Sequence, residues 1–208
     1  MDYASAFGYS NEASGLASSA VGFRNKAASE NASAVGYGNN ANALAASAVG
    51  YNNTAGGVGS STIGYNNTAT NENASAFGYG NTAGGLASSA FGFSNTASGD
   101  NANAFGYNNI ASGSKSNVFG TGNTVSGSSS NAVGTANEVA AENSTAIGNN
   151  NTISSGAENS AALGNNISIS LKDSVALGNN STATAINSVT GNSSYTKCCL
   201  LYTSPSPR

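Results

Sequence analysis

A strict fourteen-residue period is the sequence feature that most limits how this chain can fold. The period is set by a glycine, which returns at Gly8, Gly22, Gly36, Gly50, Gly64, Gly78, Gly92, Gly106, Gly120, Gly134 and Gly148, and then, after a two-residue insertion, at Gly164 and Gly178. A weaker copy, Asn187-Ser-Val-Thr-Gly191, arrives one residue early. A fixed period of this kind predicts a repeat architecture, in which each repeat is one small unit stacked on the next.

The residues that precede the glycine predict a short β-strand. The residue directly before it is large and apolar in all thirteen copies: Phe7, Val21, Val35, Val49, Ile63, Phe77, Phe91, Phe105, Phe119, Val133, Ile147, Leu163 and Leu177. The position before that is alanine, except at Thr62 and Val118. β-Branched and aromatic residues suit a pleated surface, and successive residues of a strand point to opposite faces.

A second strand is predicted after a turn. The third residue beyond the glycine is asparagine in the first eleven copies: Asn11, Asn25, Asn39, Asn53, Asn67, Asn81, Asn95, Asn109, Asn123, Asn137 and Asn151. Seven residues beyond the glycine a second glycine is frequent, as at Gly15 and Gly57. Glycine and asparagine tolerate a left-handed backbone, so we expect two strands of about five residues, each closed by a turn at these positions. Asparagines stacked from repeat to repeat would form a hydrogen-bonded ladder.

These patterns predict an all-β, single-domain parallel β-solenoid of about thirteen coils, with two short strands in each coil. We expect the repeats to occupy residues 1–186, and a degenerate last coil or junction to occupy 187–198. Residues 199–208 abandon the period, hold both prolines and resemble the in-frame translation of a sequencing adapter. They are therefore interpreted as a non-native tail, and the chain as a fragment of a longer protein.

The apolar content of each coil is small, which predicts self-association. Each coil has one large apolar residue before the glycine, an aromatic in the first eight copies, and otherwise mainly alanine. Ordering fourteen residues costs more conformational entropy than so little burial offsets. A further face buried against identical chains would supply the missing area, so we expect a homo-oligomer of parallel chains in register.

Two arrangements of the columns are consistent with the sequence. When the aromatic after the glycine gives way to threonine or asparagine, as at Thr121, the alanine of the second strand becomes valine or isoleucine, as at Val125. This exchange indicates that the two positions fill one volume inside the roll. Alternatively, the alanine and glycine columns line a narrow interior, and Phe77 and its equivalents face the other chains. Both interpretations bury the column before the glycine.

The motifs Asn73-Ala-Ser-Ala-Phe-Gly78, Ser144-Thr-Ala-Ile-Gly148 and Asp173-Ser-Val-Ala-Leu-Gly178 resemble the YadA-like head repeats of trimeric autotransporter adhesins. The resemblance covers about residues 1–186. It implies a left-handed parallel β-roll, a homotrimeric head, a role in virulence, and display on the outer membrane at the surface of a bacterium. The stalk and membrane anchor of that family do not occur in this sequence, so the anchor is expected elsewhere in the full-length protein.

Enzymatic chemistry has little basis in this composition. The chain has no histidine, only 7% charged residues, and no carboxylate pair that recurs with the period. Three aspartates are too few for a calcium ion in each repeat, and both cysteines stand near the C-terminal end, at Cys198 and Cys199. We therefore expect no catalytic site, cofactor or metal. A net charge of −3 disfavours nucleic acid, and no apolar run is long enough for membrane insertion.

The function predicted is that of a non-enzymatic adhesin head. Its repeated surface would make many weak contacts with an extracellular matrix protein, a host cell or a neighbouring cell, and linked contacts gain affinity through effective concentration. Two alternatives remain: a phage tail fibre or other receptor-binding surface rod, and an ice-binding solenoid. The ice-binding alternative rests on a column of threonines, Thr54, Thr68, Thr82 and Thr96, interrupted by Ile110 before Thr124.

Overall fold

The computed structural model describes residues 3–184 and the backbone of residues 199–200. These residues form a parallel β-solenoid of about thirteen coils, with two strands in most coils and no helix within the described ranges. The predicted all-β fold and its period are therefore confirmed. The chain divides into two compact units, residues 1–108 and 109–208.

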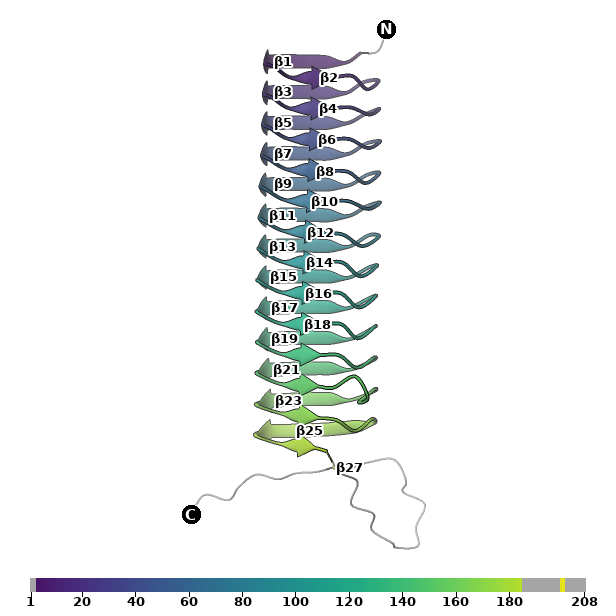
Figure 1. The fold of residues 1–208 in the computed structure, drawn as a ribbon, viewed down its shortest axis with the longest axis vertical. Helices are drawn as coiled ribbons and strands as arrows, with labels where there is room; N and C mark the ends of the chain where they lie inside the picture. Colours follow the sequence, from purple (N-terminus) through teal and green to yellow (C-terminus); the bar gives the residue numbers. More distant parts are fainter. Residues whose placement is uncertain (1–2, 185–198, 201–208) are drawn as a thin grey trace, which may run out of the picture. The chain divides into compact units, whose positions relative to one another are not determined.

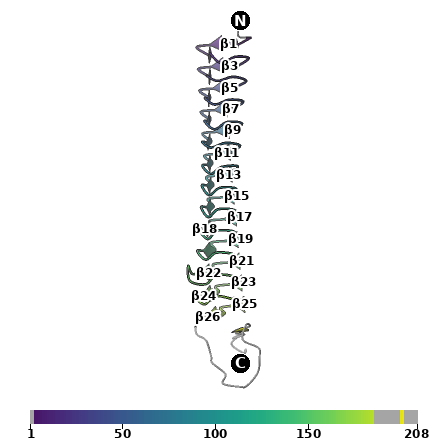
Figure 2. The same cartoon turned by 90° about the vertical axis from the view of Figure 1, so that its right-hand side faces the viewer.

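In the first unit, two parallel sheets run side by side, one of longer strands and one of short strands (Figures 1 and 2). The longer strands are β1 (Ser5–Tyr9), β3 (Ser19–Phe23), β5 (Ser33–Tyr37), β7 (Ser47–Tyr51), β9 (Ser61–Tyr65), β11 (Ser75–Tyr79), β13 (Ser89–Phe93) and β15 (Asn103–Tyr107). The short strands are β2 (Glu12–Ala13), β4 (Lys26–Ala27), β6 (Asn40–Ala41), β8 (Thr54–Ala55), β10 (Thr68–Ala69), β12 (Thr82–Ala83) and β14 (Thr96–Ala97). Every strand pairs with its equivalent fourteen residues on, so that Ile63 lies beside Phe77 and Gly64 beside Gly78.

The second unit has the same construction. Its longer strands are β17 (Asn117–Thr121), β19 (Asn131–Thr135), β21 (Thr145–Asn149), β23 (Ala161–Asn165) and β25 (Ser174–Asn179), and its short strands are β16 (Ile110–Ala111), β18 (Thr124–Val125), β20 (Glu138–Val139), β22 (Thr152–Ile153), β24 (Ser168–Ile169) and β26 (Thr182–Ala183). Thr145 of β21 pairs with Ala161 of β23, a step of sixteen residues. The two-residue insertion is therefore absorbed in the turn between β22 and β23, and the register of both sheets resumes beyond it.

Little of the predicted C-terminal organisation falls within the described residues. The junction predicted at 187–198 lies outside them, and so does 201–208 of the predicted tail. A two-residue strand, β27 (Cys199–Leu200), pairs in parallel with β25.

The second strand of each coil is shorter than predicted, with two residues in place of about five. In the first unit, the backbone N–H of Ser14 still donates to the carbonyl of Ala27 at 3.0 Å in the next coil. The chain then turns, and the N–H of Ser18 donates back to the carbonyl of Gly15 at 3.1 Å. The second sheet ends there because the backbone must bend back toward the first sheet.

The prediction that the glycine of the period and the fixed asparagine take up the left-handed turn positions was wrong. The glycine lies inside the longer strand, and the turns use residues two and nine positions beyond it, such as Asn66 (φ 55°) and Asn73 (φ 56°). Asparagine and glycine recur at these positions because they adopt positive φ at low cost. The fixed asparagine directly follows the first of these turn residues.

Alanine lines most of the interior of the first unit, and valine and isoleucine join it in the second, as at Val125 and Ile153. Alanines of the longer strands, such as Ala20 and Ala34, and of the short strands, such as Ala27 and Ala41, are fully buried. Their methyl groups form the core of the first unit together with alanines of the turns. The core is therefore thin, because alanine brings the two backbones close together.

The column before the glycine lies on the outside of the single chain, as in the arrangement that places alanine inside the roll, and its burial against other chains stays a prediction. In the structure nine of its members, from Phe7 to Leu177, have exposed side chains, and Val49, Phe77, Phe91 and Phe105 are partly buried. The column points outward because its neighbour in the strand, the alanine, points inward.

The shared volume inferred from the aromatic exchange is also wrong. Tyr37 is 39% exposed on the outside of the unit, whereas Ala41, its counterpart in the exchange, is fully buried. The structure gives no physical account of the covariation. The threonine column of the ice-binding alternative lies on the short strands, where Thr54, Thr68 and Thr96 are partly buried and Thr82 is exposed.

Candidate functional site: two exposed columns on a ladder scaffold

The asparagine ladder fixes the position of each coil on the next. In the first unit, Nδ2 of Asn67 donates to Oδ1 of Asn53 at 3.0 Å and to the carbonyls of Ile63 at 3.1 Å and Gly78 at 2.8 Å. Its own Oδ1 accepts the backbone N–H and Nδ2 of Asn81, at 3.0 and 3.1 Å. This pattern confirms the predicted ladder, and it places a fully hydrogen-bonded polar column in the interior.

The ladder occurs in both units. Its members from Asn25 to Asn95 in the first unit and from Asn109 to Asn151 in the second are buried, and Asn11 is half-buried. Ile167 then takes the asparagine position, with its backbone N–H donating to Oδ1 of Asn151 at 3.0 Å. Buried amides that satisfy one another along the coils favour one register, since a slipped coil would leave them unpaired.

The repeated glycine is required by the close approach of consecutive coils. Gly64 has φ 121°, and a Cβ added there would lie 2.1 Å from the carbonyl oxygen of Gly78 in the next coil. No side chain fits at that distance, and the backbone conformation itself is one that only glycine adopts readily. The glycine column therefore allows the backbones of consecutive coils to lie close together, within reach of the asparagine amides.

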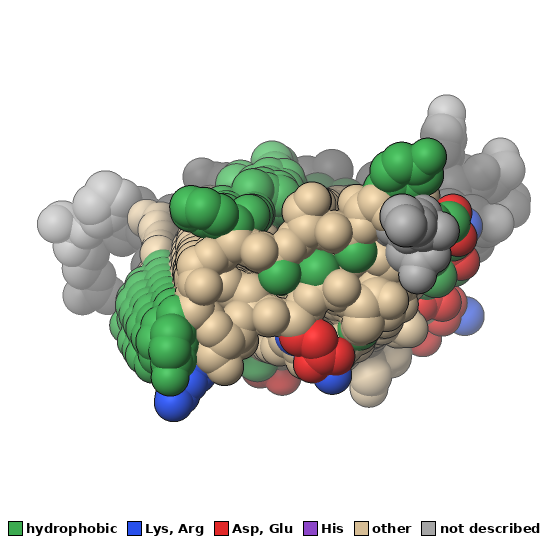
Figure 3. Space-filling view, turned by 90° about the horizontal axis from the view of Figure 1, so that it is seen from above, with side chains coloured by type: hydrophobic (Ala, Val, Ile, Leu, Met, Phe, Trp, Pro, Cys, Tyr) green, Lys and Arg blue, Asp and Glu red, His purple; other side chains and the backbone are tan. Residues whose placement is uncertain are grey.

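The apolar column before the glycine forms an exposed stripe on the outer face of the longer strands. In the first unit Val21 is 36% exposed and Ile63 is 46% exposed. Within this stripe, the rings of Phe77, Phe91 and Phe105 stack with centroids 4.7 and 4.9 Å apart. Seen from above in Figure 3, hydrophobic side chains gather in separate stripes on the surface. Exposed apolar stripes are common where proteins contact their partners.

The residues after the glycine form a second stripe, which we call the aromatic column. It contains Tyr9, Phe23, Tyr37, Tyr51, Tyr65, Tyr79, Phe93 and Tyr107, all in the first unit. Consecutive rings stack with centroids 4.7–5.3 Å apart and with planes within 14° of each other. The sequence showed this column, and one of its two interpretations placed the aromatic side chains inside the roll; the stacking of the rings on the outside was missed.

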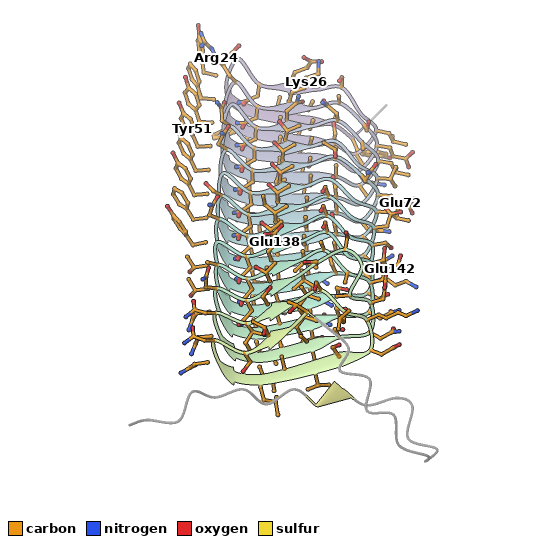
Figure 4. All side chains as sticks on the ribbon, turned by 60° about the horizontal axis from the view of Figure 1, so that its bottom comes forward. Arg24, Lys26, Tyr51, Glu72, Glu138 and Glu142 are labelled. Atoms are coloured by element: carbon orange, nitrogen blue, oxygen red, sulfur yellow. The ribbon has the colours of Figure 1, made fainter. Side chains whose placement is uncertain are left out.

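The opposite edge of the first unit carries residues that the sequence interpretation did not single out. Figure 4 shows Tyr51 at one edge and Glu72 at the other. At the position of Glu72 in other repeats stand the exposed apolar residues Leu16, Leu44, Val58 and Leu86. Their common place, eight residues beyond the glycine, was the signal that could have revealed them.

Charged groups are sparse and scattered on this scaffold. Lys26 and Glu12 form an exposed ion pair at 3.2 Å, and the guanidinium of Arg24 lies 5.0 Å from the ring centre of Phe23. Exposed pairs of this kind contribute little stability. Among the described residues, no group of three or more histidine, cysteine or acidic side chains has the proximity that a metal ion needs. Nor does any helix long and apolar enough to cross a membrane occur in that part of the chain.

Comparison with known proteins agrees with this geometry. The family model described as the YadA head domain repeat matches residues 1–25, 55–81, 83–109, 97–122, 126–151 and 172–189, which together cover more than half of the chain. A search of curated proteins finds no match. The glycine, apolar and asparagine columns all recur within the matched segments. The chain belongs to the YadA head repeat family.

Proposed function

We propose that this chain is the head segment of a non-enzymatic, homotrimeric adhesin, displayed outside the cell at a bacterial surface by an anchor elsewhere in the full-length protein. Membership of the YadA head repeat family supports the proposal. The single observation that carries it is the apolar stripe before the glycine, which a lone chain leaves exposed over many coils. That stripe needs a partner, and an identical chain in register offers a matching one.

The side chains of the stripe favour an identical chain as the partner that packs against it. The side chains at this position are phenylalanine, valine, isoleucine and leucine, without a charged residue in any of the thirteen copies. Burying them removes apolar surface from water, at about 25 cal/mol per Å². Three chains around a common axis would each bury this stripe, and a closed symmetric assembly leaves no copy of it free for further growth.

Adhesion would use the faces that remain exposed in such an assembly. The threonine column of the short strands and the polar turns recur from coil to coil. Each contact of a short polar side chain with a matrix protein or a cell surface is weak. Repetition along many coils, and over three chains, would convert weak contacts into firm attachment through effective concentration.

The attachment of beads tests the adhesive function. Beads carrying the full chain at several densities are washed over purified matrix proteins, cultured cells and bare polystyrene, with beads carrying an unrelated β-sheet protein as control. The proposal predicts attachment to at least one of these surfaces, rising more steeply than in proportion to density because the contacts act together. Attachment no greater than that of the control beads on every surface would refute it.

A further inference from the structure

The middle of the aromatic column has four consecutive tyrosines, Tyr37, Tyr51, Tyr65 and Tyr79, one on each of four successive coils. Their ring centroids lie 4.8, 4.9 and 4.8 Å apart, with planes inclined by 5°, 3° and 3°. The side chains are 39–47% exposed. Parallel coils in register thus hold the same atoms of adjacent phenols in equivalent positions, one coil apart.

We propose that these four tyrosines are a site of oxidative cross-linking, at which adjacent phenols of one chain join as dityrosine. The oxidant would be hydrogen peroxide acting through a peroxidase, which removes one electron at a time. Each of two neighbouring phenols gives up one electron and one proton and becomes a tyrosyl radical. The bond would then tie one coil covalently to the next.

The coupling step balances as follows. In each radical the ring carbon ortho to the oxygen-bearing carbon forms the new C–C bond, and the hydrogen on each joined carbon moves to its phenol oxygen, which restores both aromatic rings. The pair has lost two hydrogen atoms as two protons and two electrons. One molecule of peroxide accepts these and becomes two molecules of water.

The geometry favours coupling within the chain over coupling between chains. A radical on Tyr51 has a phenol on each side, at Tyr37 and Tyr65, already parallel to it. Joining two rings requires them to tilt toward each other, and exposed side chains change rotamer within picoseconds to nanoseconds. A phenol of a separate assembly would have to reach the same short separation by diffusion. The stacking of coils thus holds the phenols close enough to react with each other.

The composition of the column supplies matched variants. Tyr51→Phe combined with Tyr79→Phe leaves no two adjacent tyrosines in the column. Tyr9→Phe combined with Tyr107→Phe removes the same number of phenols, yet keeps all three adjacent pairs. Phenylalanine already stacks in this column at Phe23 and Phe93, so both variants are expected to fold.

The full chain and both variants are treated in dilute solution with a haem peroxidase and hydrogen peroxide, with free tyrosine as a positive control for oxidation. Circular dichroism first verifies the β-fold. Dityrosine is then measured by its fluorescence in the single-chain band of a denaturing gel, and by the loss of two hydrogen atoms per cross-link in the intact mass. The expected result is dityrosine in the wild type and in the Tyr9/Tyr107 variant, and its loss in the Tyr51/Tyr79 variant.

Three results would overturn the proposal: equal dityrosine in the Tyr51/Tyr79 variant, none in the wild type while free tyrosine is oxidised, or dityrosine only in bands heavier than one chain. If the double variant does not fold, Tyr65→Phe serves in its place. This single change removes two of the three adjacent pairs, so a reduced but measurable yield supports the proposal and an unchanged yield contradicts it.

Discussion

At the scale of single residues, two side-chain choices determine how closely the coils stack. The glycine brings backbones so near that a Cβ at Gly64 would meet the carbonyl oxygen of Gly78 at 2.1 Å. The side-chain amide of Asn67 then donates to the carbonyl of Gly78, which this close approach brings within hydrogen-bond distance. An alanine-rich core is too small to specify the register by shape alone, so the buried amides take over much of that role.

Replacement of one amide tests this role. Asn67→Leu keeps a similar volume but removes the donor to Gly78 and the acceptor for Asn81. Each buried polar group left unpaired costs about 1–3 kcal/mol. We therefore expect the free energy of unfolding to fall by about 3 kcal/mol or more, measured by urea unfolding at a fixed chain concentration.

Asn66→Gly is the control for this variant. Asn66 is exposed with φ 55°, and glycine already stands at the equivalent Gly38 and Gly80. Its unfolding midpoint should hardly change. Equal stability of the Asn67 variant and the wild type would show that the ladder does not stabilise the fold.

At the scale of the elements, each longer strand separates an interior of small residues from an outer face of large ones. In β13 the alternation places Ala90 in the core and Phe91 on the outside. The core remains thin because alanine faces alanine across it. This division explains why a lone chain leaves its largest apolar side chains in water.

A pair of neighbouring substitutions tests this division. Ala90→Leu inserts a large side chain into the thin core and is expected to destabilise the fold by about 1–3 kcal/mol through overpacking. Phe91→Leu, on the opposite face, introduces a residue found at the equivalent Leu163 and Leu177 and should have little effect. Thermal unfolding followed by circular dichroism compares the two. A larger loss for Phe91→Leu than for Ala90→Leu would contradict the assignment of the faces.

The sequence predicted the strands and their pairing better than it predicted which side of each strand lies inside the roll. The period, the strand before the glycine, the parallel pairing and the asparagine ladder all follow from residues that recur at fixed positions. Alternation shows which residues share a face of a strand, but it does not show which face lies inside. The sequence therefore left two arrangements open, one with the large columns inside the roll and one with the alanine and glycine columns inside it. In the structure alanine dominates the interior, joined by larger residues such as Val125 and Ile153 in the second unit, and Phe7 and its equivalents face outward.

At the scale of the whole molecule, the apolar stripe before the glycine is the surface that a single chain leaves exposed to water. It recurs in both units, with Ile63 46% exposed in the first and Ile147 43% exposed in the second. Chains that associate in parallel bring each stripe against its copies, without any change in the coils. Stability should then depend on chain concentration, because the associated state is favoured by mass action.

Sedimentation equilibrium of the full chain tests this account most directly. The account predicts a single species with three times the mass of the chain, with the β-spectrum of the folded state, and dissociation when Ile63→Asp and Ile147→Asp place charges in the stripe. A folded monomer over the whole range of concentrations would contradict it.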